Sequence, residues 1–74
     1  MSLMERTLVN SSSLASVGYS PEVSTLEIEF HHGASYQYFA VPQHIFDGLL
    51  AAASKGAYFN EHIKDRYPFR LLSP

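Results

Sequence analysis

The sequence predicts a small α+β domain in which a three-stranded antiparallel β-meander is followed by two helices packed on one face of the sheet (β-β-β-α-α). Three observations lead to this prediction. Apolar and polar residues alternate in three segments of the first half of the chain, as in strands with one buried face, and apolar residues recur at helical spacing in the second half. With 74 residues, 46% of them hydrophobic, the chain can form one small core.

The two ends of the chain are expected to lie outside this domain. Residues 1–10 carry no periodic pattern, and we expect them to be disordered or to be left over in part from cloning. The single domain is placed at residues 11–70, and residues 71–74 are interpreted as a C-terminal tail.

The first two strands are predicted from alternation. Residues 14–19 alternate with the period of a strand, and a turn containing Pro21 follows. Residues 25–31 form the clearest strand, with Leu26, Ile28 and Phe30 on one side and Glu27, Glu29 and His31 on the other. Its polar face is expected to meet solvent or a partner.

The third strand follows a glycine turn. The segment His31-His32-Gly33 fits a three-residue hairpin loop with Gly33 in a left-handed conformation. In the register that this loop sets, Ile28 faces Tyr36, Leu26 faces Tyr38, and the glutamates face Ser35 and Gln37. Both tyrosines then lie on the apolar face under the helices, and Phe39 is left on the polar face.

Two helices are predicted after this strand. Pro42 suits the first helical turn, and one apolar stripe follows it, formed by Ile45, Phe46, Leu49, Leu50 and Ala53. Gly56 is expected to end this helix in a left-handed conformation. A second helix is predicted over about residues 57–66, before Pro68.

The composition narrows the possible functions. The absence of cysteine excludes thiolate metal sites and redox cysteine chemistry, and it favours a reducing, cytoplasmic location. No segment reaches the roughly 18 apolar residues of a membrane span. The net charge of −2 is unfavourable for strong nucleic-acid binding. However, residues 1–53 carry one basic and five acidic residues, whereas residues 54–74 carry four basic and two acidic residues, so a local phosphate-binding surface is possible in the second half.

Several short motifs occur in a fixed order along the chain. They are Gly18-Tyr19, residues 26–30, Gly33, Tyr36-x-Tyr38, Val41-Pro42, Ser54-Lys55-Gly56, Tyr58-Phe59-Asn60, Ile63-Lys64 and Tyr67. With these motifs, the chain resembles the KTSC family, named for a domain at the C-terminus of some lysyl-tRNA synthetases and also found as stand-alone bacterial proteins. The resemblance covers residues 11–67, and its hallmark is the central Tyr-x-Tyr. Through the synthetase context, it implies RNA, and tRNA in particular, as a ligand.

Two groups of residues are candidates for RNA contacts. Tyr36 and Tyr38 have the chemistry of a base-stacking platform, although the predicted register favours a core position for both, and Phe39 is the more exposed stacking candidate or an ordinary interface residue. The turn Ser54-Lys55-Gly56 can present N–H groups and a positive charge to a phosphate, or it can simply end a helix. A polar, basic strip on the second helix, formed by Asn60, Lys64 and Arg66, would extend this surface.

The sequence shows no pattern that predicts catalysis or a metal site. The four histidines lack the spacing of zinc ligands, and the three adjacent serines have no obvious base beside them. We therefore expect a non-catalytic binding module without a cofactor, with RNA as its ligand. The alternative is a protein-interaction or homodimerisation module that uses the open sheet face and Phe39.

Overall fold

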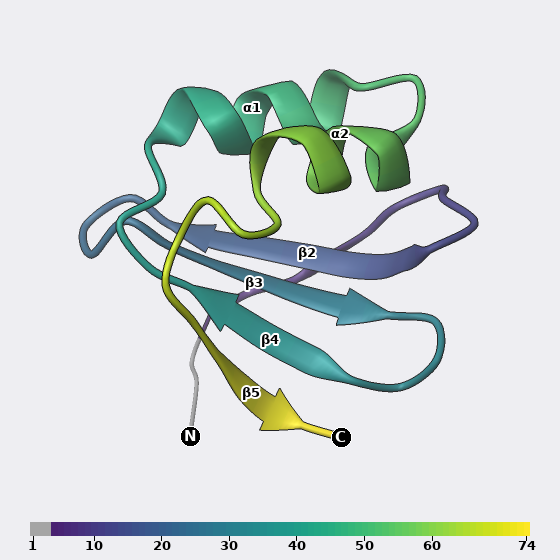
Figure 1. Cartoon of the computed structure of the whole chain (residues 1–74), viewed down its shortest axis with the longest axis horizontal. Helices are drawn as coiled ribbons and strands as arrows, with labels where there is room; N and C mark the ends of the chain where they lie inside the picture. Colours follow the sequence, from purple (N-terminus) through teal and green to yellow (C-terminus); the bar gives the residue numbers. More distant parts are fainter. Residues whose placement is uncertain (1–3) are drawn as a thin grey trace.

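The computed structural model describes residues 4–74 and contains one antiparallel sheet with two helices packed on one of its faces (Figure 1). The elements are β1 (Thr7–Leu8), β2 (Leu14–Ser20), β3 (Thr25–Phe30), β4 (Ser35–Tyr38), α1 (Gln43–Ala51), α2 (Lys55–His62) and β5 (Phe69–Ser73). The five strands follow one another across the sheet in chain order, and both helices are inserted between β4 and β5. This arrangement confirms the α+β class.

The prediction of three strands is wrong, because the sheet has five. The additional strands are the two edges. Thr7–Leu8 lies in the segment expected to be disordered, and Phe69–Ser73 extends into the segment interpreted as a tail. β1 has only two residues and therefore cannot show an alternating pattern. For residues 1–3, the expectation of disorder lies outside the described residues.

The β3–β4 hairpin has the predicted register. Leu26 pairs with Tyr38 and Ile28 with Tyr36. Gly33 has a φ of 107°, and its N–H donates to the Phe30 carbonyl at 2.9 Å, which closes the loop. A residue with a side chain would be strained at this φ, so glycine is needed here.

The core lies between the sheet and the helices. It is formed by Leu14, Val17, Leu26, Ile28, Tyr38, Val41, Leu49, Phe59 and Ile63. Phe30 and Tyr36, which the sequence also placed in the core, are only partly buried and pack against it. Tyr36 therefore keeps part of its ring accessible, whereas Tyr38 is 5% exposed.

The junction between the helices differs from the prediction. α1 begins after Pro42 and ends at Ala51, because Ala52 is already extended. Ser54 is the N-cap of α2, and its side-chain oxygen accepts a hydrogen bond from the Ala57 N–H at 3.3 Å. Because this bond caps the helix, α2 begins at Lys55, two residues earlier than predicted.

Gly56 consequently does not end α1; it lies in the first turn of α2, and its φ is not positive. A Cβ at this position would lie 3.0 Å from the Ser13 hydroxyl oxygen, so glycine allows residues 11–13 to pack closely on the helix. Within residues 4–74, no helix combines the length and apolar character that crossing a membrane requires.

Candidate functional site

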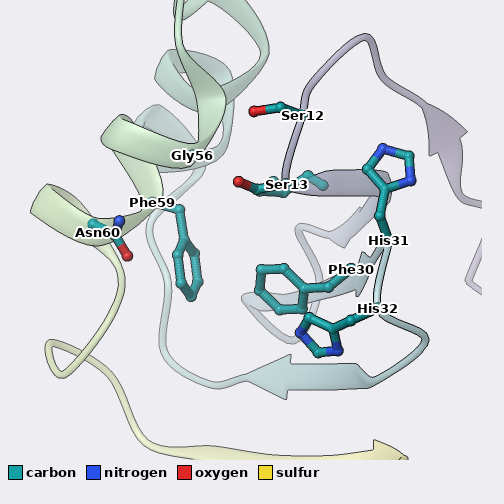
Figure 2. A pocket seen from close by; sticks show the side chains of 9 residues that line it. Ser12, Ser13, Phe30, His31, His32, Gly56, Phe59 and Asn60 are labelled. Carbon is teal, nitrogen blue, oxygen red and sulfur yellow. The ribbon is translucent and has the colours of Figure 1, made fainter.

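A large cavity lies between α2 and the strands beneath it. It has a volume of about 590 Å³. Figure 2 shows Phe59 and Asn60 projecting from α2 on one side, with the serines before β2 and the β3–β4 hairpin on the other. The lining side chains include Ser12, Ser13, Phe30, His32, Phe59 and Asn60.

Two smaller cavities continue this one along α2. A cavity of about 310 Å³ near the C-terminal end of the helix shares Phe30, His32 and Phe59 with the first. A cavity of about 220 Å³ near the N-terminal end shares Ser12. Because each shares lining residues with the first cavity, we refer to the three together as the α2 groove.

Aromatic rings form much of the groove. The Phe30 and His32 rings are stacked, with centroids 5.4 Å apart and an interplanar angle of 3°. Phe59 meets the Phe30 ring edge-on at 5.3 Å, and Phe69 meets Tyr36 edge-on at 5.9 Å. Phe69 is 56% exposed, so the end of the groove beside β5 offers an accessible aromatic surface.

A lysine lies at each end of the groove. Lys55 lines the N-terminal cavity, and its ammonium donates to the Ala52 carbonyl at 3.1 Å. An ammonium has three donors, so this bond leaves two for a ligand. Lys64 lines the C-terminal cavity and is exposed.

Tyr38 lines the C-terminal cavity and is 5% exposed. Burial, followed by the neighbouring Tyr36 and Asp65, raises the pKa of the Tyr38 hydroxyl to about 12. The hydroxyl makes no hydrogen bond to residues 4–74, and no buried side-chain polar atom of the described chain lacks a partner. The Tyr38 hydroxyl is therefore in contact with solvent. We infer that solvent reaches it through the C-terminal cavity, which Tyr38 lines.

Seven of the nine candidate RNA-binding residues line this groove: Tyr36, Tyr38, Ser54, Lys55, Gly56, Asn60 and Lys64. Two do not. Phe39 lines a separate hollow on the opposite face with Gln37, and Arg66 lines none of the three groove cavities.

The sequence reasoning missed His32, Phe69 and Asp65 as groove residues. Phe69 and Leu71 alternate with Arg70, as in a strand, but the sequence analysis places the end of the domain at residue 70 and a tail at residues 71–74. His32 was assigned only to the hairpin loop. The His32 ring stacks on Phe30, two residues earlier in the sequence, and no sequence pattern predicts such a contact.

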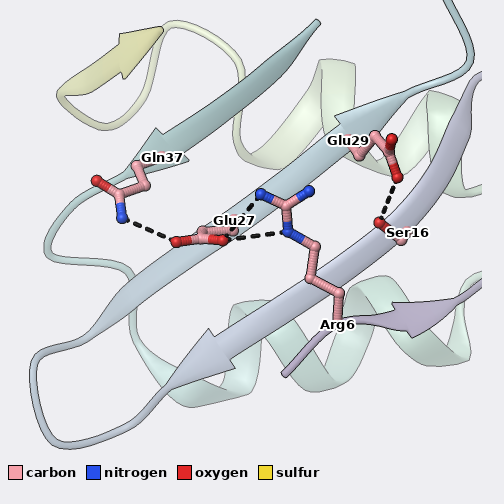
Figure 3. A network of polar contacts seen from close by, with 5 residues as sticks. All are labelled: Arg6, Ser16, Glu27, Glu29 and Gln37. Carbon is pink, nitrogen blue, oxygen red and sulfur yellow. Dashed lines mark hydrogen bonds and ion pairs between the residues drawn. The ribbon is translucent and has the colours of Figure 1, made fainter. Parts of the chain in front are cut away.

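The face of the sheet opposite the helices is partly covered, whereas the sequence predicted an open face. A Cβ on Gly18 would lie 2.5 Å from the backbone oxygen of Glu5, so the glycine allows the N-terminal segment to cross β2 here. From this segment the Arg6 guanidinium reaches Glu27, with Nε 3.1 Å from Oε1 (Figure 3). Gln37 donates to the other oxygen of Glu27 at 2.9 Å. Glu27 is fully buried as a result.

Known proteins share both the sequence and the fold. The family model described as the KTSC domain matches residues 10–67. An uncharacterized protein of Stutzerimonas stutzeri is 47% identical over 64 residues, which is 86% of this chain and 90% of that protein. A lysine–tRNA ligase of Nostoc punctiforme is 44% identical over 55 residues, which is 74% of this chain but only 10% of the ligase. A crystal structure of a KTSC domain protein from Yersinia pestis has a TM-score of 0.88 and 38% identity, and the match covers 93% of this chain and 97% of that one.

Proposed function

The chain belongs to the KTSC domain family, and we propose that it is a small, non-catalytic RNA-binding module of the cytoplasm. Its ligand is a short single-stranded stretch of RNA, with tRNA as the first choice, held in the α2 groove. The observation that carries the proposal is the combination of aromatic rings along the groove with a lysine at each end.

The chemistry of the groove suits single-stranded RNA. Proteins bind unpaired bases by stacking them on aromatic rings, and each stacked base contributes about 1–3 kcal/mol. Tyr36 and Phe69 offer such rings at one end of the groove, and the stacked pair Phe30 and His32 lies beside them. A duplex could not present its bases to these rings.

The charge of the groove suits a phosphate backbone. Lys55 is the first residue of the eight-residue helix α2, and Lys64 lies two residues beyond its end, so an RNA strand that follows the groove passes both ammonium groups. The tRNA context comes from a relative, because the Nostoc punctiforme protein is a lysine–tRNA ligase.

Binding can be tested by amide-shift titration with bulk tRNA and with a short single-stranded RNA. We expect the largest shifts in α2, in residues 11–13 and in β4–β5. Lys55→Glu and Lys64→Glu should each weaken binding to all RNA sequences alike and lower the slope of affinity against salt by about one phosphate contact.

Arg70→Glu is the matched control. Arg70 pairs with Gln37 on the face opposite the helices. Replacing Arg70 with Glu therefore makes the same change of charge as the lysine variants, but away from the groove. If both lysine variants bind RNA as tightly as the parent at low and moderate salt, or if Arg70→Glu weakens binding equally, the groove is not an RNA site.

A second candidate is a protein-interaction or homodimerisation module. It is favoured by the edge strand β5, where Phe69 and Leu71 are 56% and 50% exposed. An exposed edge strand can pair with another chain. Such an interface would be much less sensitive to salt than RNA binding, and sedimentation at micromolar concentration would reveal it.

A further inference from the structure

The C-terminal cavity of the α2 groove contains a hydroxyl that lacks a partner. Tyr38 is 5% exposed, yet its hydroxyl makes no hydrogen bond to residues 4–74. With the pKa of this group raised to about 12, the hydroxyl stays protonated at neutral pH and acts as a donor. The hydroxyl oxygen is in contact with solvent in this cavity, so it is free to donate to an acceptor on a bound ligand.

An acceptor lies near this donor. Asp65 lines the same cavity and is close enough to contribute to the raised pKa of Tyr38. Its carboxylate makes no hydrogen bond or ion pair with residues 4–74. An ionised carboxylate only accepts hydrogen bonds, and its two oxygens can receive two N–H groups at once.

The walls of the cavity are aromatic. The rings of Tyr36, Phe69 and His32 surround it, and Phe69 meets both Tyr36 and Tyr38 at centroid distances of 5.9 Å. At about 310 Å³, the cavity lies at the lower end of the roughly 300–1,000 Å³ typical of small-molecule sites. Its volume therefore suits one planar ring system.

We propose that this cavity binds one unstacked nucleobase of the RNA and selects guanine, with Tyr38 donating to the base carbonyl and Asp65 accepting from its N–H groups. Guanine presents a carbonyl beside two N–H positions, whereas adenine and cytosine present a single amino group and uracil a single N–H between two carbonyls. Lys64, at the rim, lies where it can meet the phosphate of the same nucleotide. This inference rests on the RNA binding proposed above.

The test measures base preference by fluorescence anisotropy, using short oligouridines that carry a single G, A, C or U at the centre. We expect the guanine oligomer to bind roughly tenfold more tightly than the others, as for a good bidentate base contact. Two variants locate this preference. Asp65→Asn keeps a residue that tolerates the φ of 62° at this position, and Tyr38→Phe removes only the hydroxyl.

Both variants should lose most of the guanine preference, measured as the ratio of the affinities for the guanine and the all-uridine oligomers. Thermal unfolding of each variant verifies that the fold is intact. RNA binding with equal affinity for all four oligomers would overturn the guanine site and leave the proposed function standing. A preference that survives in both variants would also overturn it, because the selecting residues would then lie elsewhere. No binding to any oligomer or to tRNA would remove the proposed function and this inference together.

Discussion

The Arg6 guanidinium lies 3.1 Å from the carboxylate of Glu27, a residue that is fully buried on the face of the sheet opposite the helices. The two residues are 21 positions apart, and the contact fixes the N-terminal segment across β2. A buried carboxylate is stable only with partners that satisfy its charge. The central part of this face is therefore closed by the chain itself, which leaves the α2 groove and the β5 edge as the more accessible surfaces.

Arg6→Met should lower the free energy of unfolding by about 2 kcal/mol, because it removes a charged partner of a buried carboxylate while keeping much of the side-chain volume. Urea unfolding at neutral pH measures the change. Arg70→Met is the matched control, since Arg70 is on the same face but makes no ion pair with residues 4–74. Equal effects of the two substitutions would show that the contact with Glu27 does not stabilise the fold.

Gly18→Ala should displace the N-terminal segment. The new Cβ would lie 2.5 Å from the Glu5 backbone oxygen, and a backbone atom cannot move aside as a side-chain tip can. We expect a loss of roughly 1–3 kcal/mol in stability, as for an overpacked site. Amide hydrogen exchange in residues 4–10 should also become faster. Unchanged exchange in this segment would contradict the close approach.

The raised pKa of Tyr38 predicts a loss of stability at alkaline pH. The folded state keeps the hydroxyl proton up to about pH 12, whereas the unfolded state releases it around pH 10. The contribution is therefore fully present below pH 10 and is lost as the pH rises towards 12, by at most about 2–3 kcal/mol.

Urea unfolding at about pH 9 and about pH 11 tests this dependence. Tyr38→Phe should make the decline shallower without abolishing it, because burial also raises the pKa of Tyr58. In an ultraviolet titration of the folded protein, the same substitution should remove the last tyrosine to ionise. A parent and variant with the same decline would show that Tyr38 titrates normally.

The hairpin could be predicted from the sequence because its determinants are local. Gly33 fixes the loop, and the alternation from Leu26 to Phe30 then allows only one register that buries the apolar side chains. The edge strand β1 lacks such determinants. β1 is ordered by contacts with distant residues, among them the one between Arg6 and Glu27, and these contacts leave no pattern in the local sequence.

The candidate site could be predicted in part for the same reason. Lys55 was recognisable as part of a turn, and Asn60 and Lys64 as part of a polar strip. The three residues line the groove, although α2 ends at His62 and Lys64 lies beyond it. The opposite wall comes from residues 11–13, the hairpin and β5, and only the packing of the sheet brings these segments to α2. Gly56 shows the difference clearly, because its role is set by Ser13 and not by its own conformation.

Phe69 and Phe39 offer a matched comparison of the two faces of the domain. Phe69 packs against Tyr36 and Tyr38 at the end of the groove, whereas Phe39 is half-buried beside Gln37 on the opposite face. Phe69→Ala should weaken the binding of single-stranded RNA roughly tenfold, because it removes one stacking surface. Phe39→Ala should leave RNA binding unchanged.

The same pair of variants separates RNA binding from the protein-interaction alternative. If β5 serves as an interface between copies of the chain, Phe69→Ala should shift sedimentation at micromolar concentration towards the monomer, and the shift should persist at high salt, because burial of apolar surface is only weakly screened. RNA binding by the groove predicts instead that Phe69→Ala changes affinity for RNA while the sedimentation of the free protein stays the same. If Phe39→Ala, and not Phe69→Ala, reduces either RNA binding or self-association, the functional surface is the face that Arg6 partly closes, and the α2 groove must be abandoned as the site.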